Sequence, residues 1–266
     1  MQHHIERLRR GLWVLKQPLT QVPKLNGVPV SDLFVWRNSE DWKTSFELID
    51  IPGLFIDREN TSERYVTLFF FDSNGTPFLE KRLELIRNQR QTIDLSELLS
   101  KSENPVGTFC AFHSYTPEVV AGLGSFIAER GYVSYCYKGA PLRAYVHGNL
   151  DAISLQPDKS MQLLGTTSFR VREYRLQHEL LGPALYEMAV VNPSSRDQRF
   201  SCQVFSTLNG EILDAQEVQL RSRGSHVFPI QVKQSQTARI VLNSRLVMAR
   251  PLVFRIHQQR INVFHG

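Results

Sequence analysis

The sequence predicts an all-β protein of two tandem β-sandwich domains, Ig-like or fibronectin-like in general architecture, with one short helix in the central segment. The main observation is a strand–turn–strand unit that occurs twice, over residues 64–95 and 199–230, at a constant offset of 135 residues (199 minus 64) without a gap. Each copy carries Asn-Gly at its tip, Asn74-Gly75 and Asn209-Gly210. Asn-Gly between two apolar runs is a strong β-hairpin signal and predicts a type I′ turn. A repeat of this kind constrains the whole fold.

The apolar positions of the two copies correspond better than their identities do. Phe69 aligns with Val204, and Leu83 aligns with Val218. Several short strands separated by turn residues favour a sandwich or a barrel over a helical fold. The resemblance is to a fold that many unrelated proteins share, so it implies no activity.

The length of 266 residues suits two domains of about 100–150 residues each. We expect five segments in chain order, and the second repeat hairpin falls within the second sandwich. They are an N-terminal segment (1–30), a first β-sandwich closed by an aromatic-rich hairpin (31–150), a linker (151–168), a second β-sandwich (169–257) and a loose tail (258–266). The short helix is expected to begin at Thr116, where Pro117 suits its first turn.

Composition excludes some classes of protein. The formal net charge is +5, and the 31 basic residues divide into 23 Arg and 8 Lys. No recognition helix or RNA-binding motif accompanies this excess of arginine, so we do not expect nucleic acid as the partner. No stretch approaches the roughly 20 apolar residues of a membrane span, so no membrane insertion is expected.

Cysteine usage gives the expected compartment. Cys110, Cys136 and Cys202 are three in number, lie in apolar strand-like surroundings and show no CxxC spacing. Buried free thiols in a reducing compartment are the expected state, which places the protein in the cytoplasm.

The first copy of the repeat is apolar on both strand faces. Val66, Leu68 and Phe70 alternate with Tyr65, Thr67, Phe69 and Phe71. A strand that is apolar on both sides is covered on both sides. We therefore expect Val66, Leu68 and Phe70 to form an interface, with the N-terminal segment, the central segment, the other domain or a second copy of the chain. Homodimerisation through the first domain is one form of this expectation.

Residues 131–149 supply the main candidate binding site. With a three-residue loop at 139–141, the strands would place Tyr137 opposite Arg143, Tyr135 opposite Tyr145, and Val133 opposite His147. Aromatic rings beside a guanidinium can stack on sugar rings or bases and pair with anions. The predicted ligand-binding residues are Tyr135, Tyr137, Arg143, Tyr145 and His147. The other interpretation is that the tyrosines pack against a covering element or at a domain interface.

The function expected from these features is that of a non-enzymatic binding or assembly protein that recognises a glycan or another anionic ligand on the hairpin face 131–149. One alternative is an enzyme, a hydrolase or transferase on a glycan-like substrate, with its site near His113, His147 and Asp151. A second alternative is a purely structural, oligomer-forming protein. The sequence contains no nucleotide-binding or nucleophile-elbow motif and no zinc-type ligand spacing, so no cofactor, metal site or catalytic residue is assigned.

Overall fold

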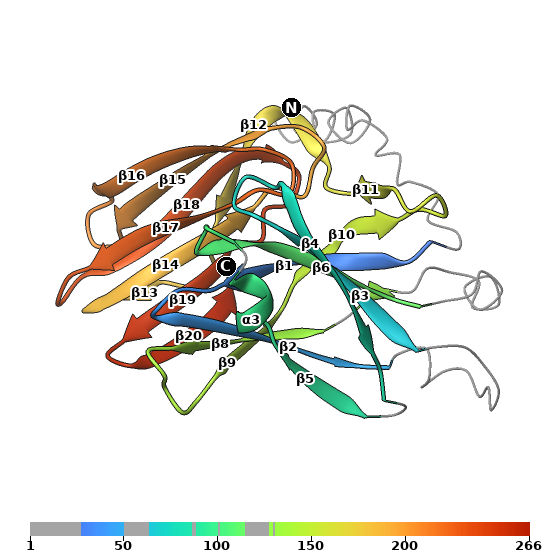
Figure 1. The fold of residues 1–266 in the computed structure, drawn as a ribbon. Helices are drawn as coiled ribbons and strands as arrows, with labels where there is room; N and C mark the ends of the chain where they lie inside the picture. Colours follow the sequence, from blue (N-terminus) through green and yellow to red (C-terminus); the bar gives the residue numbers. More distant parts are fainter. Residues whose placement is uncertain (1–27, 51–63, 87–88, 101, 115–127, 130) are drawn as a thin grey trace.

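A computed structural model describes residues 28–50, 64–86, 89–100, 102–114, 128–129 and 131–266 (Figure 1). Over these residues the chain is all-β, with four sheets and a single four-residue helix, α3 (Ser96–Leu99). The all-β prediction is confirmed. The helix expected at Thr116 and nearly all of segment 1–30 lie outside the described residues. Where the structure describes the chain, no helix is long and apolar enough to cross a membrane.

The first pair of sheets comes from the N-terminal part of the chain. Its larger sheet contains, in spatial order, β11 (Met161–Leu163), β10 (Asn149–Leu155), β1 (Val30–Arg37), β6 (Val106–His113), β3 (Tyr65–Phe71) and β4 (Pro77–Glu84), with β7 (Ala128–Glu129) parallel to β1. Its smaller sheet contains β5 (Arg90–Asp94), β2 (Trp42–Ile49), β8 (Tyr132–Tyr137) and β9 (Ala144–His147). The buried residues of both sheets belong to one hydrophobic cluster, which includes Phe34, Phe46 and Phe109.

The second pair of sheets comes from the C-terminal part. One sheet contains β12 (Thr167–Arg175), β18 (Thr237–Leu246), β15 (Gln198–Ser206) and β16 (Ile212–Leu220), with β13 (Leu180–Leu181) beside β18. The other contains β17 (Ser225–Val232), β14 (Ala184–Val191), β19 (Leu252–His257) and β20 (Arg260–His265). Their shared core is a second hydrophobic cluster.

The repeat extends well beyond the two hairpins that reveal it. The order β1-β6-β3-β4 in one sheet matches β12-β18-β15-β16, and the order β5-β2-β8-β9 in the other matches β17-β14-β19-β20. The corresponding strands also follow one another in the same chain order. In both halves the first strand joins the sheet of the third strand, whereas the first two strands of an Ig domain share a sheet.

Both predicted repeat hairpins form, β3–β4 and β15–β16, but their turns are not of type I′. That turn needs positive φ at both central residues. Here Gly75 (φ +80°) and Gly210 (φ +73°) have positive φ, while Asn74 and Asn209 do not. The first turn closes with Gly75 N–H donating to the Asp72 carbonyl at 3.0 Å, and the strand register shifts beside it. A turn followed by a left-handed glycine fits a longer loop with a bulge.

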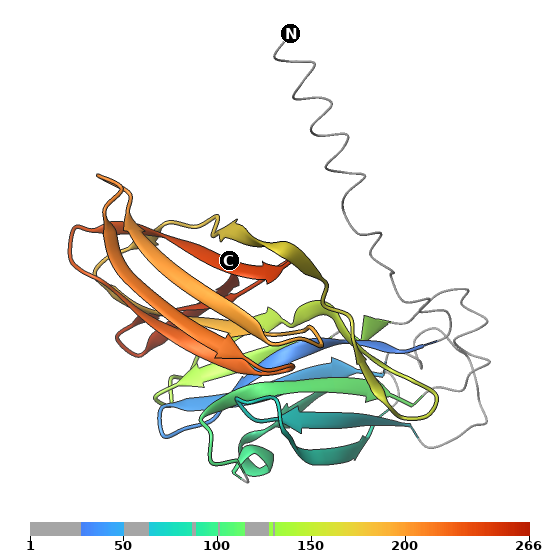
Figure 2. The same cartoon turned by 90° about the horizontal axis from the view of Figure 1, so that it is seen from above.

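Strands buried on both faces occur in both halves: all eight residues of β1 are buried, and β14 and β19 in the second half are buried against two different cores. One face of β14 and β19 contributes Tyr186, Met188, Val190 and Val253 to the core of the second pair. The opposite face contributes Ala189, Val191, Leu252, Phe254 and Ile256 to the cluster of the first pair. This sheet therefore belongs to both cores, and Figure 2 shows the second pair lying along one side of the first.

The interface expected at Val66, Leu68 and Phe70 is a wrong prediction. All three side chains are fully buried in the core of the first pair and offer nothing to a second copy of the chain. The opposite face of β3 is the one that needs covering. Phe71 on that face is buried beneath Arg223, whose guanidinium carbon lies 4.9 Å from the ring centroid. The cover at this position comes from the second half.

Two other segments are more ordered than expected. The predicted linker (151–168) contains most of the β10 strand and all of β11, which extend the large sheet next to β1. The predicted loose tail (258–266) contains β20, which pairs with β19 from Leu252↔His265 to His257↔Arg260. Pro157-Asp158 lies at the tip of the β10–β11 hairpin. Turn residues are common both in hairpin tips and in linkers, so the composition of this segment resembled that of a linker.

The cysteines agree with the sequence prediction. Cys110, Cys136 and Cys202 are all free and buried. Burial raises the pKa of the Cys110 thiol far above its usual range and that of Cys202 to about 12. Both thiols therefore stay protonated and act as small apolar side chains.

We call the contact between the first pair of sheets (the first half) and the second pair (the second half) the joint between the halves. One aromatic ring and one ion pair contribute to it. Phe254 of β19 lies 5.1 Å from the Trp42 ring and 4.9 Å from the Tyr135 ring, measured between centroids. Arg37 of β1 stacks on Trp42 at 3.8 Å and pairs with Glu187 of β14. Burial lowers the pKa of Arg37, and the Glu187 carboxylate opposes this effect. The charge of the buried Arg37 guanidinium is therefore compensated by a carboxylate from the other half.

The joint predicts a large cost for removing that carboxylate. Glu187→Ala leaves a buried guanidinium without its partner, so we expect a loss of about 3–5 kcal/mol in the free energy of unfolding. The control is Glu217→Ala, which removes the carboxylate of the exposed pair with Arg199 and should cost about 0–1 kcal/mol. Urea unfolding of both variants measures this, and equal costs would contradict a buried, structural role for the Arg37 pair.

The repeat offers a second matched comparison. An added Cβ at Gly75 would lie 1.9 Å from the Ser222 carbonyl oxygen, whereas one at Gly210 would meet nothing within 4 Å. Gly210→Ala should cost only the left-handed strain, about 1–2 kcal/mol. Gly75→Ala adds a clash with backbone of the other half and should cost about 1–3 kcal/mol more. Urea unfolding again gives the difference, and the idea fails if the two substitutions are equivalent.

Candidate functional site

The hairpin of β8 and β9 has a register one residue away from the predicted one. Tyr132 pairs with His147, Val133 with Val146, and Tyr135 with Ala144. The connection between the strands, residues 138–143, begins with a tight turn at Lys138 (φ +49°) and Gly139 (φ +67°), in which the Ala140 N–H donates to the Tyr137 carbonyl at 3.0 Å. A one-residue change of register moves side chains to the opposite face. The five predicted ligand-binding residues therefore do not form one surface.

Tyr135 and Tyr137 lie on the inner face of the hairpin. Tyr135 is fully buried, and its hydroxyl donates to the Val35 carbonyl at 2.7 Å. Tyr137 packs against Trp42 with ring centroids 4.9 Å apart. Burial raises the pKa of the Tyr135 hydroxyl far above its usual range. These two tyrosines fill the joint with the second half, as the packing interpretation of the sequence anticipated, and they are not available as an exposed platform.

The opposite face of the hairpin is open and combines two tyrosines with an arginine. Tyr132 is 58% exposed and Tyr145 is 47% exposed. Ser134 pairs with Tyr145 and Tyr132 pairs with His147, so the two tyrosines are diagonal neighbours on one face. Diagonal pairs are separated by about 7–8 Å, which is within reach of aromatic side chains. We call Tyr132, Arg143, Ser134 and Tyr145, together with Ser45 of β2, the outer hairpin face.

Arg143 is held in place across this face. Its Nε donates to the Ser134 hydroxyl at 2.8 Å, and its Nη2 donates to the Ser45 hydroxyl at 2.9 Å. Both serines are buried beneath it. Asp94 lies nearby on β5, where burial opposes ionisation, but hydrogen bonds from Ser96 and the charges of Arg143 and Lys43 together lower the pKa of Asp94. The arrangement fixes a guanidinium on the same strand face as the two exposed rings.

Next to the outer hairpin face, Glu47 of β2 is buried and forms an ion pair with Arg90 of β5. Lys43 lies exposed on the same side of the sheet. The surroundings of Tyr132 and Tyr145 are therefore polar, with a positive charge that is only partly compensated. Such a surface suits a ligand that carries hydroxyl groups and negative charge.

His147 is the cross-strand partner of Tyr132 and borders the outer hairpin face, and it also contacts side chains of the second half. Its ring lies 4.6 Å from the His265 ring, between centroids, and its Nε2 is 3.4 Å from Nη2 of Arg250. The His265 Nε2 lies 3.1 Å from the His147 carbonyl oxygen, within hydrogen-bond distance. Burial, with the charges of Arg250 and His147, lowers the pKa of His265 to about 4. Residues 103 and 118 positions apart form these contacts, so no local sequence signal could have identified the group.

The residues of the enzyme alternative have separate partners. His113 is buried, and its Nε2 lies 3.0 Å from the Ile49 carbonyl oxygen. His147 contacts the second half instead, and Asp151 is placed in β10 by its backbone alone. Within the described ranges, no group of three or more His, Cys, Asp or Glu side chains could hold a metal ion.

Sequence reasoning missed Tyr132 although it lies in the stretch that was singled out. The predicted loop was confined to 139–141, whereas the observed connection runs over 138–143 and also keeps Pro141 out of the ladder. Lys138 opens this connection with a positive φ, which is uncommon for lysine, so no local signal indicated the true register.

No protein-family model matches this sequence, and no curated protein matches it. Among solved structures, the chain is similar to a glycosyl hydrolase family 2 member from Bacteroides cellulosilyticus DSM 14838, with 6% sequence identity and a TM-score of 0.16. The match covers 95% of this chain and 30% of the hydrolase chain, so this chain spans under a third of that protein. A TM-score this low carries no information about activity.

The His265 environment predicts a dependence of stability on pH. Its pKa of about 4 in the folded protein lies below the ordinary value of 6.5. Between these values the unfolded chain binds a proton that the folded protein does not bind, so stability falls as pH decreases from 7 to 4. His265→Gln should reduce this fall. Urea unfolding at several pH values measures it, with the exposed His257→Gln as the control. Identical pH profiles for His265→Gln and wild type would refute the assignment.

Proposed function

We propose that the protein is a non-enzymatic binding protein of two tandem β-sandwich modules, Ig-like in general architecture, and that the outer hairpin face binds an acidic glycan. The observation that carries the proposal is the exposed pair Tyr132 and Tyr145 with Arg143 fixed on the same face by two serine hydroxyls. The modules share the packing of two antiparallel sheets with Ig domains, although their first strand occupies a different sheet.

The chemistry of the face supports this class of ligand. A tyrosine ring presents an apolar face on which a sugar ring can stack, and its hydroxyl keeps a polar tip in water. One edge of the Arg143 guanidinium donates hydrogen bonds to two serine hydroxyls. The side chain is therefore held in a single orientation for a carboxylate or sulfate. Pre-ordering an arginine side chain reduces the entropy lost on binding.

The geometry favours binding over catalysis at this face. An enzyme needs an acid, base or nucleophile within reach of the reacting group. Arg143, Tyr132 and Tyr145 supply stacking and charge, while the buried Glu47 is paired with the exposed Arg90. The contacts of the described residues do not bring His113 and His147 together, so we do not propose the hydrolase or transferase alternative.

The test is a calorimetric titration of the full chain with an oligogalacturonate and with a neutral oligosaccharide of the same length. We expect saturable binding of the acidic glycan only. Tyr132→Ser, Tyr145→Ser and Arg143→Gln should each weaken it by about tenfold or more, equivalent to about 1.4 kcal/mol.

Phe169→Ser is the matched control, because Phe169 is an exposed aromatic residue (88%) on β12, in the other half of the protein. This variant should bind like wild type. The proposal is refuted if wild type binds none of a panel of carboxylated and sulfated glycans. It is also refuted if a variant that combines Tyr132→Ser, Arg143→Gln and Tyr145→Ser binds as well as wild type.

A further inference from the structure

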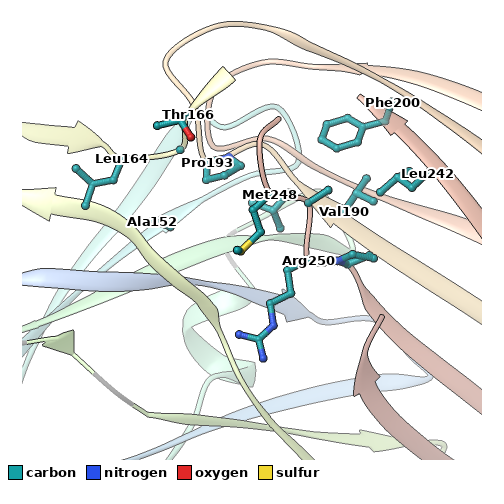
Figure 3. Close-up of a pocket in the computed structure, with 13 residues that line it drawn as sticks. Ala152, Leu164, Thr166, Val190, Pro193, Phe200, Leu242, Met248 and Arg250 are labelled. Carbon is teal, nitrogen blue, oxygen red and sulfur yellow. The ribbon is translucent and has the colours of Figure 1, made fainter. Parts of the chain in front are cut away.

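Exposed apolar side chains gather at one end of the second half, where β12 lies beside the end of β18. Phe169 on β12 is 88% exposed, and Met248, two residues after β18, is 67% exposed. Val171 and Val247 are exposed as well. The Val247 N–H donates to the Thr166 carbonyl at 2.9 Å, and Thr166 and Met248 line the same pocket in Figure 3. The two segments therefore form one part of the surface.

Strand β12 has a wide bulge at this place. Between Thr167 and Arg172, four residues of β12 lie opposite the single Arg245 of β18. The Ser168 hydroxyl holds the bulge together, because it donates to the Arg170 carbonyl at 2.6 Å and accepts from the Arg170 N–H at 3.1 Å. A bulge changes the direction in which side chains leave a strand. Here it leaves two apolar side chains and one arginine exposed to solvent.

The charge around these side chains is positive. Segments 164–172 and 244–251 contain four arginines and no aspartate or glutamate. Arg170 and Arg245 are exposed, and neither forms an ion pair with a residue that the structure describes. Glu173, next along β12, is already paired with a neighbouring arginine. We call the following six residues the apolar–basic patch: Phe169, Arg170, Val171, Arg245, Val247 and Met248.

The size and chemistry of the patch favour a lipid surface over a protein partner. A stable protein–protein interface buries about 800 Å² and about 20–30 residues on each side, whereas this patch has six residues. A bilayer needs no complementary pocket, because its head groups and acyl chains rearrange around a side chain that enters them. Apolar side chains bury at the boundary of the acyl chains, while arginines stay among the head groups and are attracted by anionic lipid.

We propose that the apolar–basic patch docks the protein on an anionic lipid bilayer. Phe169 and Met248 enter the boundary between head groups and acyl chains, and Arg170 and Arg245 pair with lipid phosphates. Each arginine near such a surface strengthens binding by about fivefold. With two free arginines the attachment is reversible and weakened by salt. The proposal does not depend on the glycan proposal, because the patch shares no residue with the outer hairpin face.

The test is co-sedimentation of the full chain with vesicles of two compositions, phosphatidylcholine alone and equal parts of phosphatidylcholine and phosphatidylserine. We expect wild type to bind the anionic vesicles about tenfold or more tightly than the neutral ones, since two arginines act together. Added salt should reduce this preference, because it screens the charge of the head groups.

Variants of the patch separate its two contributions. Phe169→Ser and Met248→Ser should each weaken binding to anionic vesicles by about fivefold or more, because each removes a buried apolar group. The double variant Arg170→Gln/Arg245→Gln should lose the preference for anionic vesicles. Phe169→Ser should still bind the acidic glycan as wild type does, so the two proposals can fail separately.

Two matched controls lie elsewhere on the surface. Leu208→Ser removes an apolar side chain that is 80% exposed at the β15–β16 turn, close to Glu211 and away from the patch. Arg260→Gln lowers the net charge by one at an exposed position of β20. Both variants should bind anionic vesicles as wild type does, and thermal melts check that every variant is folded.

The proposal is overturned if wild type binds neither kind of vesicle, or binds both equally. It is also overturned if folded Phe169→Ser and Arg170→Gln/Arg245→Gln variants bind like wild type. Sedimentation velocity without vesicles tests the other occupant. Self-association of wild type that Phe169→Ser abolishes would assign the patch to a second copy of the chain and would equally overturn the lipid proposal.

Discussion

The structure depends on one sheet that is buried on both faces. Strands β14 and β19 supply one row of side chains to the core of their own half and the opposite row to the core of the other half. Burial of apolar surface is the dominant favourable contribution to folding, at roughly 25 cal/mol per Å². Phe254 carries this contact into the first half, between Trp42 and Tyr135. Arg37 and Glu187 then fix the orientation of the halves, because neither charge tolerates burial alone.

The candidate site follows from this joint. Tyr135 and Tyr137 anchor the inner face of the β8–β9 hairpin, which leaves the outer face on a rigid support. A binding surface on strands held by a packed core keeps its geometry better than one on a mobile loop.

The sequence predicted the parts of the fold that local chemistry determines. The Asn-Gly tips located both repeat hairpins, β3–β4 and β15–β16. It did not predict which strands are covered twice. An apolar run such as residues 66–71 has the same sequence pattern whether its second face packs against a neighbouring half or is only partly covered.

The candidate site was predicted in position but not in composition. The stretch 131–149 does carry the exposed tyrosines, but a one-residue error in register exchanged Tyr132 for Tyr135 and Tyr137. Register in a hairpin follows the length and geometry of its connection, and the 138–143 connection begins with a left-handed Lys138, which is uncommon for lysine. Arg250 and His265 were beyond reach, because only the tertiary fold brings them to His147.

The doubly buried sheet also affects how the chain is assembled during its synthesis. Domains generally fold in order as they leave the ribosome, the N-terminal one first. Here the first half keeps Trp42 and the other joint residues exposed until Phe254, more than two hundred residues later in the chain, has been translated. The nascent N-terminal half is therefore the species with which a holdase chaperone would associate, and its release would coincide with the emergence of β19.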